Sequence, residues 1–119
     1  MKVLKILIII FISLNVSIKV NSKEQLVNSL KEGGKLIFIR HAYAQGTGGP
    51  DNFDIKDCST QRNINKKGKI QATKIGLFFT KHKIPISKVI SSEWCRCKDT
   101  ASIAFLDDYD VKKFFKFIL

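Results

Sequence analysis

The sequence predicts an α/β fold in which strand, helix, strand and helix follow one another around a parallel sheet. The apolar run at 35–39 indicates a strand that is buried on both faces, because it is β-prone and shows no polar alternation, and 86–90 indicates a second strand. The stretch from Asn65 to His82 between them has helical periodicity. Strands joined through a helix are expected to run parallel, with a right-handed crossover.

A short amphipathic helix is expected ahead of the first strand, from Lys23 to Glu32. Aliphatic side chains gather on one side of this segment. Gly33 and Gly34 follow it and are expected to end it, since glycine is common just past a helix terminus.

The helix between the two strands is expected to start after Asn65, whose side chain can cap its first turn. Gly68, Ala72, Ile75 and Phe79 recur at steps of four, three and four residues and form one face. The two small residues at the start of this face would allow a close approach to a flat neighbour.

The second expected strand is followed by Ser91 and Ser92, which are expected to open a third helix that extends to about Ala104. Beyond it, 107–119 is rich in phenylalanine and is expected to contribute a third strand.

The first 22 residues resemble a secretory signal peptide. Lys2 and Lys5 form a short basic region, an apolar run follows, and Val20, Asn21 and Ser22 fit the small-residue pattern before a cleavage site. We therefore expect 1–22 to be a signal peptide and 23–119 to be one exported domain, secreted or periplasmic. An uncleaved segment of this kind would be the only part expected to associate with a membrane.

The charge of the chain favours an anionic ligand. Its net charge is +11, and a cleaved signal segment would take away three lysines and no acid, which leaves +8. Basic residues are not clustered among aromatic ones, so nucleic acid is not an expected partner. The alternative for most lysines is a solvated surface.

The cysteines predict a disulfide rather than a metal centre. In an oxidising compartment Cys58 can pair with either Cys95 or Cys97, and one thiol is left over. No metal site is expected, because the Cys-x-Cys pair lacks further ligands at suitable spacing. No cofactor is expected either.

Two arginines and a histidine follow the predicted strands. Arg40 and His41 end the first strand, and Arg96 comes shortly after the second. Since parallel strands present their carboxyl ends at one edge of a sheet, these side chains are expected to surround one anion. Guanidinium groups suit phosphate, and a neutral imidazole can accept a phosphoryl group.

Three blocks of the sequence, LIFIRHAYA, QRNINKKGKIQATKIGLFF and VISSEWCRCKDTASIAF, resemble the histidine phosphatase superfamily, which is also called phosphoglycerate mutase-like. The matching features are Arg40-His41-Ala42, Arg62, Gly68 to Ala72, Ser91-Ser92, Arg96 and Thr100-Ala101. The resemblance spans Leu36 to Phe105. It implies a three-layer α/β/α fold with a parallel sheet, truncated here after the first two or three strands.

The resemblance also implies roles for single residues. His41 corresponds to the phosphoryl-accepting histidine, and Arg40 and Arg96 correspond to the phosphate clamp. Arg62 either binds substrate, braces the loop before the helix, or forms a salt bridge with Asp57. His82 is expected to face solvent.

Two features of the family are missing from the sequence. No histidine follows His82, and no late carboxylate is placed as the proton donor for the leaving group. We therefore expect an exported phosphomonoesterase that is truncated and weakly active. Two alternatives remain: a non-catalytic remnant that binds phosphate, and a small secreted protein that bears a disulfide. The substrate and the oligomeric state stay open.

Overall fold

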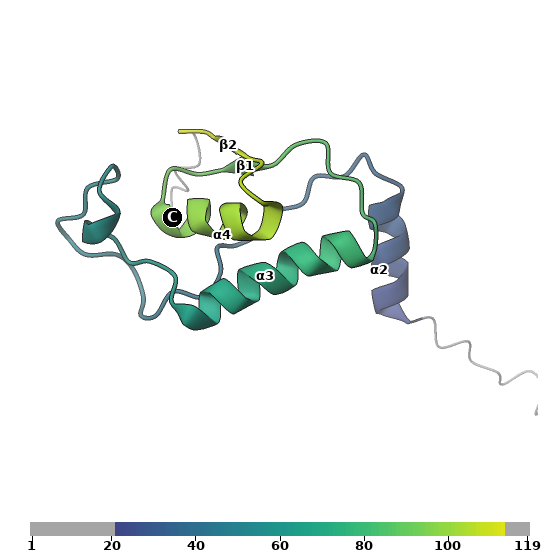
Figure 1. Ribbon diagram of the computed structural model, residues 1–119, viewed down its shortest axis with the longest axis horizontal. Helices are drawn as coiled ribbons and strands as arrows, with labels where there is room; N and C mark the ends of the chain where they lie inside the picture. The colour runs from purple at the N-terminus through teal and green to yellow at the C-terminus, as the bar shows by residue number, and fades with distance from the viewer. Residues whose placement is uncertain (1–20, 114–119) are drawn as a thin grey trace, which may run out of the picture.

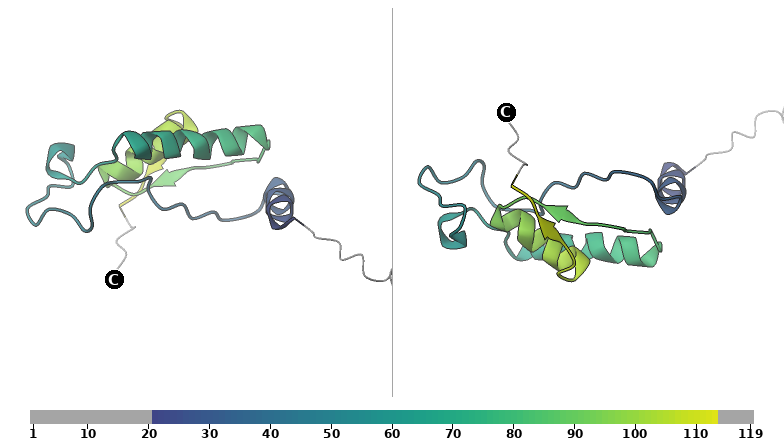
Figure 2. Two further views of the ribbon diagram at one scale, coloured as in Figure 1. Left: turned by 90° about the horizontal axis from the view of Figure 1, so that it is seen from below. Right: turned by 90° about the horizontal axis from the view of Figure 1, so that it is seen from above.

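The protein is described here by a computed structural model that covers residues 21–113, and helices dominate this part of the chain (Figure 1). In chain order, the elements are α2 (Ser22–Lys31), the 3-10 turn η1 (Cys58–Thr60), α3 (Lys66–Lys81), β1 (Ile90–Ser91), α4 (Cys95–Phe105) and β2 (Asp110–Val111). Figure 2 shows α3 and α4 packed together, with α2 set apart from them.

The predicted three-layer α/β/α fold is wrong for the described residues. The sheet consists of β1 and β2 alone, which run parallel with Ile90 opposite Asp110 and Ser91 opposite Val111. The helix that joins these two strands is α4, whereas the sequence pattern placed the crossover at the preceding helix. Two strands of two residues each cannot separate two helical layers.

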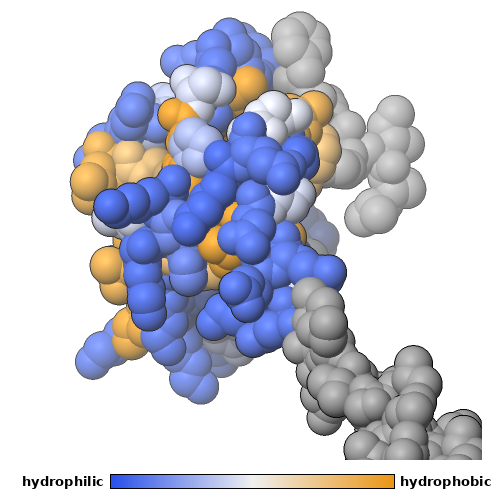
Figure 3. Space-filling model, turned by 90° about the vertical axis from the view of Figure 1, so that its right-hand side faces the viewer, coloured by the Kyte–Doolittle hydropathy of each residue, from blue (hydrophilic) through white to orange (hydrophobic). Residues whose placement is uncertain are grey.

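The apolar run at 35–39 does not form the expected buried strand. No backbone group of 36–39 is hydrogen-bonded to another described residue. Leu36 is 89% exposed and Phe38 is 77% exposed. A strand needs a neighbour to complete its hydrogen-bond ladder, and β1 pairs with β2 instead. Figure 3 shows one face of the molecule, where hydrophobic side chains lie at the surface among hydrophilic ones.

Helix α2 is confirmed, and it starts one residue before the expected position. The Asn21 side chain accepts a hydrogen bond of 3.1 Å from the Lys23 backbone N–H and caps the helix. Gly33 follows with a φ of +71°, a conformation that glycine adopts readily. The expected signal peptide otherwise lies outside the described residues, as do residues 114–119 of the expected third strand, whose described part contains β2.

Helix α3 is confirmed together with its cap. The side chain of Asn65 accepts a hydrogen bond of 3.1 Å from the backbone N–H of Gly68. Its buried face consists of Gly68, Ala72, Gly76 and Phe79. Gly76 takes the place that the pattern gave to Ile75, because the contact with α4 requires a residue without a side chain there.

Glycine lets α3 and α4 pack closely. A Cβ at Gly76 would collide with the backbone carbonyl of Ala104, and the rings of Phe79 and Phe105 meet edge to face at 5.5 Å. Helix α4 starts at Cys95, later than expected, because Ser91 belongs to β1.

The small core connects α3 to the segment that follows the first apolar run. Its buried members are Ala42, Ala44, Ile64 and Ala72. The Ala42 N–H donates a hydrogen bond of 2.9 Å to the hydroxyl of Thr100, which donates one of 2.7 Å to the Arg96 carbonyl. The start of α4 is thereby fastened to the residue after His41.

A disulfide provides a second link to α4. Of the two pairings that the sequence allows, the structure contains Cys58–Cys95, and Cys97 remains a thiol. Within residues 21–113, no helix combines the length and the apolar character needed to span a bilayer.

The contact between α3 and α4 predicts an unusual response to a helix-favouring substitution. Gly76→Ala should lower the free energy of unfolding by about 1–3 kcal/mol, because the new methyl group meets backbone that cannot rotate away. The same change in an exposed helix would stabilise it by about 1 kcal/mol. Urea denaturation measures the difference. Thr73→Ala, at an exposed position of the same helix, should change stability by less than about 0.5 kcal/mol. A more stable Gly76→Ala protein would contradict the packing described.

Candidate functional site

The structure brings His41 together with the arginines that the sequence singled out. Burial is the main reason that the pKa of the His41 imidazole lies below its usual 6.5. The hydrogen bond to Ala42 raises the pKa, whereas the positive charges of Arg96, Arg62 and Arg40 each lower it further. The charges of three guanidinium groups therefore act on one imidazole, and each of them favours its neutral form.

The hydrogen bond of His41 selects one tautomer. Its Nδ1 lies 2.8 Å from the carbonyl oxygen of Ala42, which can only accept a hydrogen bond. Nδ1 therefore carries the proton, and the lone pair of the neutral ring is at Nε2. Because the Ala42 backbone is itself fixed by Thr100, the ring has a defined orientation.

Arg96 reaches the site from the first turn of α4. Its guanidinium stacks on the indole of Trp94, with Cζ 4.2 Å from the ring centroid. Nε and Nη1 are buried and have no hydrogen-bond partner. Burial lowers the pKa of Arg96, and Arg62 and Arg40 lower it further, against an opposing effect of Cys97. Buried donors without partners are uncommon, and an anion would satisfy them.

Arg62 braces the loop that follows His41. Its Nε donates a hydrogen bond of 2.7 Å to the carbonyl of Gly48, and Nη1 donates to those of Ala44 at 2.6 Å and Gly46 at 3.1 Å. Of the roles considered from the sequence, the loop brace is the one that the contacts show. The salt bridge to Asp57 is absent, since that carboxylate accepts hydrogen bonds from Ser59.

The positive charge of the site is not neutralised within the described residues. The ion pairs found there join Lys35 to Glu32 at 3.4 Å and Lys88 to Asp110 at 2.9 Å, and none includes an arginine. Arg40 is exposed. Guanidinium groups that lack a carboxylate partner are suited to an anion with several oxygens.

Gln61 and Thr100 hold the site together, although the sequence patterns assigned them no such role. The buried Gln61 amide donates to the carbonyls of Asp54 at 2.9 Å and Ile55 at 3.0 Å. Its oxygen accepts a hydrogen bond of 3.0 Å from the Cys95 N–H. Thr100 lies four residues after Arg96, on the same helix face, and this spacing was the one signal in the sequence that could have linked Thr100 to the site.

His82, the second histidine, lies away from the site. It caps the carboxyl end of α3, and its ring is 4.8 Å from that of Phe78. The other end of α3 contacts Tyr43, and a helix of 16 residues is about 24 Å long. Ser91 is buried in β1, and its hydroxyl bonds to the carbonyl of Ser92. Residues 21–113 contain no cluster of three metal-binding side chains.

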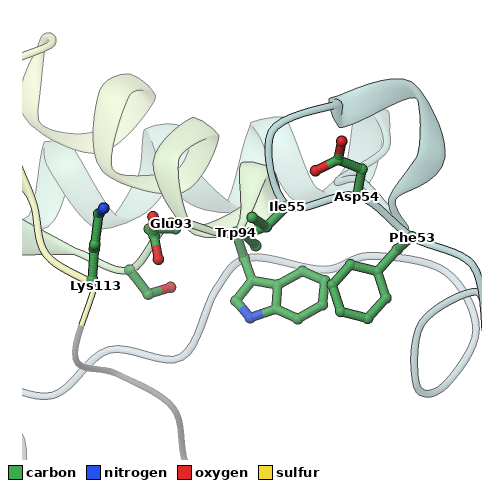
Figure 4. Close-up of a pocket in the computed structure, with 7 residues that line it drawn as sticks. Phe53, Asp54, Ile55, Glu93, Trp94 and Lys113 are labelled. Atoms are coloured by element: carbon green, nitrogen blue, oxygen red, sulfur yellow. The ribbon is translucent and has the colours of Figure 1, made fainter.

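A pocket of about 480 Å³ opens beside Trp94 (Figure 4). The rings of Phe53 and Trp94 lie 4.5 Å apart, and Figure 4 shows them side by side at one end of the pocket. The residues that line it are Phe53, Asp54, Ile55, Ser92, Glu93, Trp94 and Lys113. Trp94 is shared by this pocket and by the stack with Arg96, so the two sites adjoin.

Comparisons with protein-family models, with curated proteins and with solved structures found no match to this chain. The function is therefore inferred from the geometry of the site and from the sequence motifs.

The electrostatics of the site predict how His41 titrates. Its NMR titration midpoint should lie below 6.5, because protonation adds a charge to a buried ring beside three cations. Arg40→Gln should raise that midpoint, since one of these cations is removed. Lys74→Gln, which changes an exposed lysine of α3, should leave it unchanged. A wild-type midpoint above 6.5, or no rise in Arg40→Gln, would show that the groups do not converge.

Proposed function

We propose that the protein is an exported phosphomonoesterase that acts through a phosphohistidine at His41. The single observation that carries this proposal is the His41 ring itself: its Nδ1 is hydrogen-bonded to the Ala42 carbonyl, which leaves the lone pair of the neutral ring at Nε2, and three arginines without a carboxylate partner act on its pKa. The proposal does not depend on the three-layer fold. The resemblance of the sequence motifs to the histidine phosphatase superfamily supports it independently.

The chemistry divides hydrolysis into two displacements. His41 Nε2 attacks phosphorus, the bond from phosphorus to the ester oxygen breaks, and the alcohol leaves with a proton from water. Water then attacks the phosphohistidine, which releases inorganic phosphate and restores the neutral imidazole. Arg40 and Arg96 stabilise the charge on the transferring group, and Arg62 fixes the adjoining loop.

Slow turnover of alkyl esters is part of the proposal. No carboxylate is among the groups that shift the pKa of His41, so none is shown beside the imidazole to protonate the leaving alkoxide. General acid catalysis typically contributes about 10²–10⁴-fold to rate. Esters whose alcohol leaves readily as an anion should therefore be the better substrates.

Export is the localisation that we propose. The disulfide between Cys58 and Cys95 is compatible with an oxidising compartment, and the apolar segment at the start of the sequence resembles a signal peptide.

Phosphate binding without turnover is the second candidate function. The absence of an evident proton donor favours it, as does the use of Arg62 as a brace rather than as a free ligand. In that case the anion would occupy the same arginines, and no phosphoryl group would be transferred to His41. A secreted protein whose disulfide serves stability alone would bind no phosphate.

The covalent intermediate separates these candidates. Rapid mixing with p-nitrophenyl phosphate and denaturation in alkali should yield an acid-labile phosphoryl group on His41, detected by mass spectrometry. His41→Ala should abolish it, and His82→Ala should retain it, because His82 stacks on Phe78 at the far end of α3. Labelling that persists in His41→Ala would contradict the mechanism. Phosphate binding without any label would favour the second candidate.

A further inference from the structure

The pocket beside Trp94 adjoins the candidate site, and no role has yet been assigned to it. We propose that it binds a planar aromatic ring carried by the phosphorylated ligand, so that aryl phosphates or nucleoside monophosphates are preferred over alkyl phosphates. This inference rests on the proposed function, because it assumes that the arginines hold the phosphate. It adds the chemical class of the group to which the phosphate is attached.

The first support is the position of Trp94. The Arg96 guanidinium stacks on the indole with Cζ 4.2 Å from its centroid, and Phe53 lies 4.5 Å from the same ring system. The aromatic surface therefore begins at the guanidinium to which the proposed function assigns the phosphate. A ligand that has its ring within a few bonds of phosphorus can reach both.

The second support is the way in which Phe53 is held. The next residue, Asp54, donates its backbone N–H to the hydroxyl of Thr60 at 2.8 Å, and its carbonyl accepts from Gln61 at 2.9 Å. Arg62 fixes the preceding part of the same loop. Phe53 itself remains 42% exposed. A large aromatic side chain on a fastened backbone is thus presented to solvent at the pocket instead of being packed in the core.

The arrangement of the two rings selects the kind of ligand. Because Phe53 and Trp94 already contact each other, they form a joined surface and leave no gap between them for an ammonium group. A cation, Arg96, also occupies the indole already. A planar ring can extend this surface by stacking, which every nucleobase and phenyl group can do. Asp54, Glu93 and Lys113 at the rim can meet polar groups on such a ring.

Intrinsic fluorescence provides a direct test, because Trp94 is the only tryptophan in the chain. The full chain is titrated with inorganic phosphate, glycerol 2-phosphate, phenyl phosphate and uridine 5′-monophosphate, with excitation at the red edge of indole absorption. Phenyl phosphate should bind about tenfold more tightly than glycerol 2-phosphate, which is the usual scale of one stacking contact. If uridine 5′-monophosphate also binds more tightly than glycerol 2-phosphate, nucleotides belong to the ligand class. If only phenyl phosphate does, the ligands are aryl esters.

A variant then assigns the preference to the pocket. Phe53→Leu should remove the tenfold difference and leave the affinity for glycerol 2-phosphate unchanged. Phe78→Leu, which changes a phenylalanine that stacks on His82, should preserve the tenfold difference. Equal affinities of the wild-type protein for phenyl phosphate and glycerol 2-phosphate would overturn this inference alone. Failure of every ligand, inorganic phosphate included, to bind would overturn the proposed function as well.

Discussion

The hydroxyl of Thr100 joins the two segments on which the site depends. It accepts a hydrogen bond from the Ala42 N–H, 58 residues away in the sequence, and donates one to the carbonyl of Arg96. Because no sheet ladder holds the segment before His41, this buried link fixes its imidazole beside the start of α4. Gln61 and the Cys58–Cys95 disulfide fasten the same helix to the loop region. The site is therefore positioned by side chains rather than by a sheet edge.

The links impose an electrostatic cost. Arg40, Arg62 and Arg96 lie near one another and near a half-buried imidazole, and Arg96 has buried donors without partners. Like charges held together raise the free energy of the empty site, and an anion at their centre removes this penalty. Burial is the main reason that the pKa of the imidazole is lowered, and the same three charges lower it further, so the lone pair that would attack phosphorus is available at neutral pH. In the proposed function, the charges that attract the anion therefore also favour the nucleophilic form of the imidazole.

Local patterns were sufficient for the helices and insufficient for the sheet. The cap at Asn65 and three of the four residues of the buried face of α3 follow from nearby residues, whereas Gly76 replaces Ile75 because of the contact with α4. The run at 35–39 has the composition of a buried strand, yet strand formation requires a partner whose identity no local pattern contains. Arg62 illustrates the same limit, since its acceptors are carbonyls 14 to 18 residues away. The convergence of His41 with Arg96 was expected from parallel strands, and the structure achieves it through Thr100 instead.

A crystal structure of the protein with bound vanadate would test most directly whether His41, Arg40 and Arg96 converge on one anion. Vanadate mimics phosphate and accepts a bond from an imidazole nitrogen. The account predicts vanadium bonded to His41 Nε2, with vanadate oxygens contacted by Arg40 and Arg96 and the indole of Trp94 still stacked on the guanidinium. Vanadate bound at other residues, or a His41 ring whose Nε2 points away from these arginines, would contradict it.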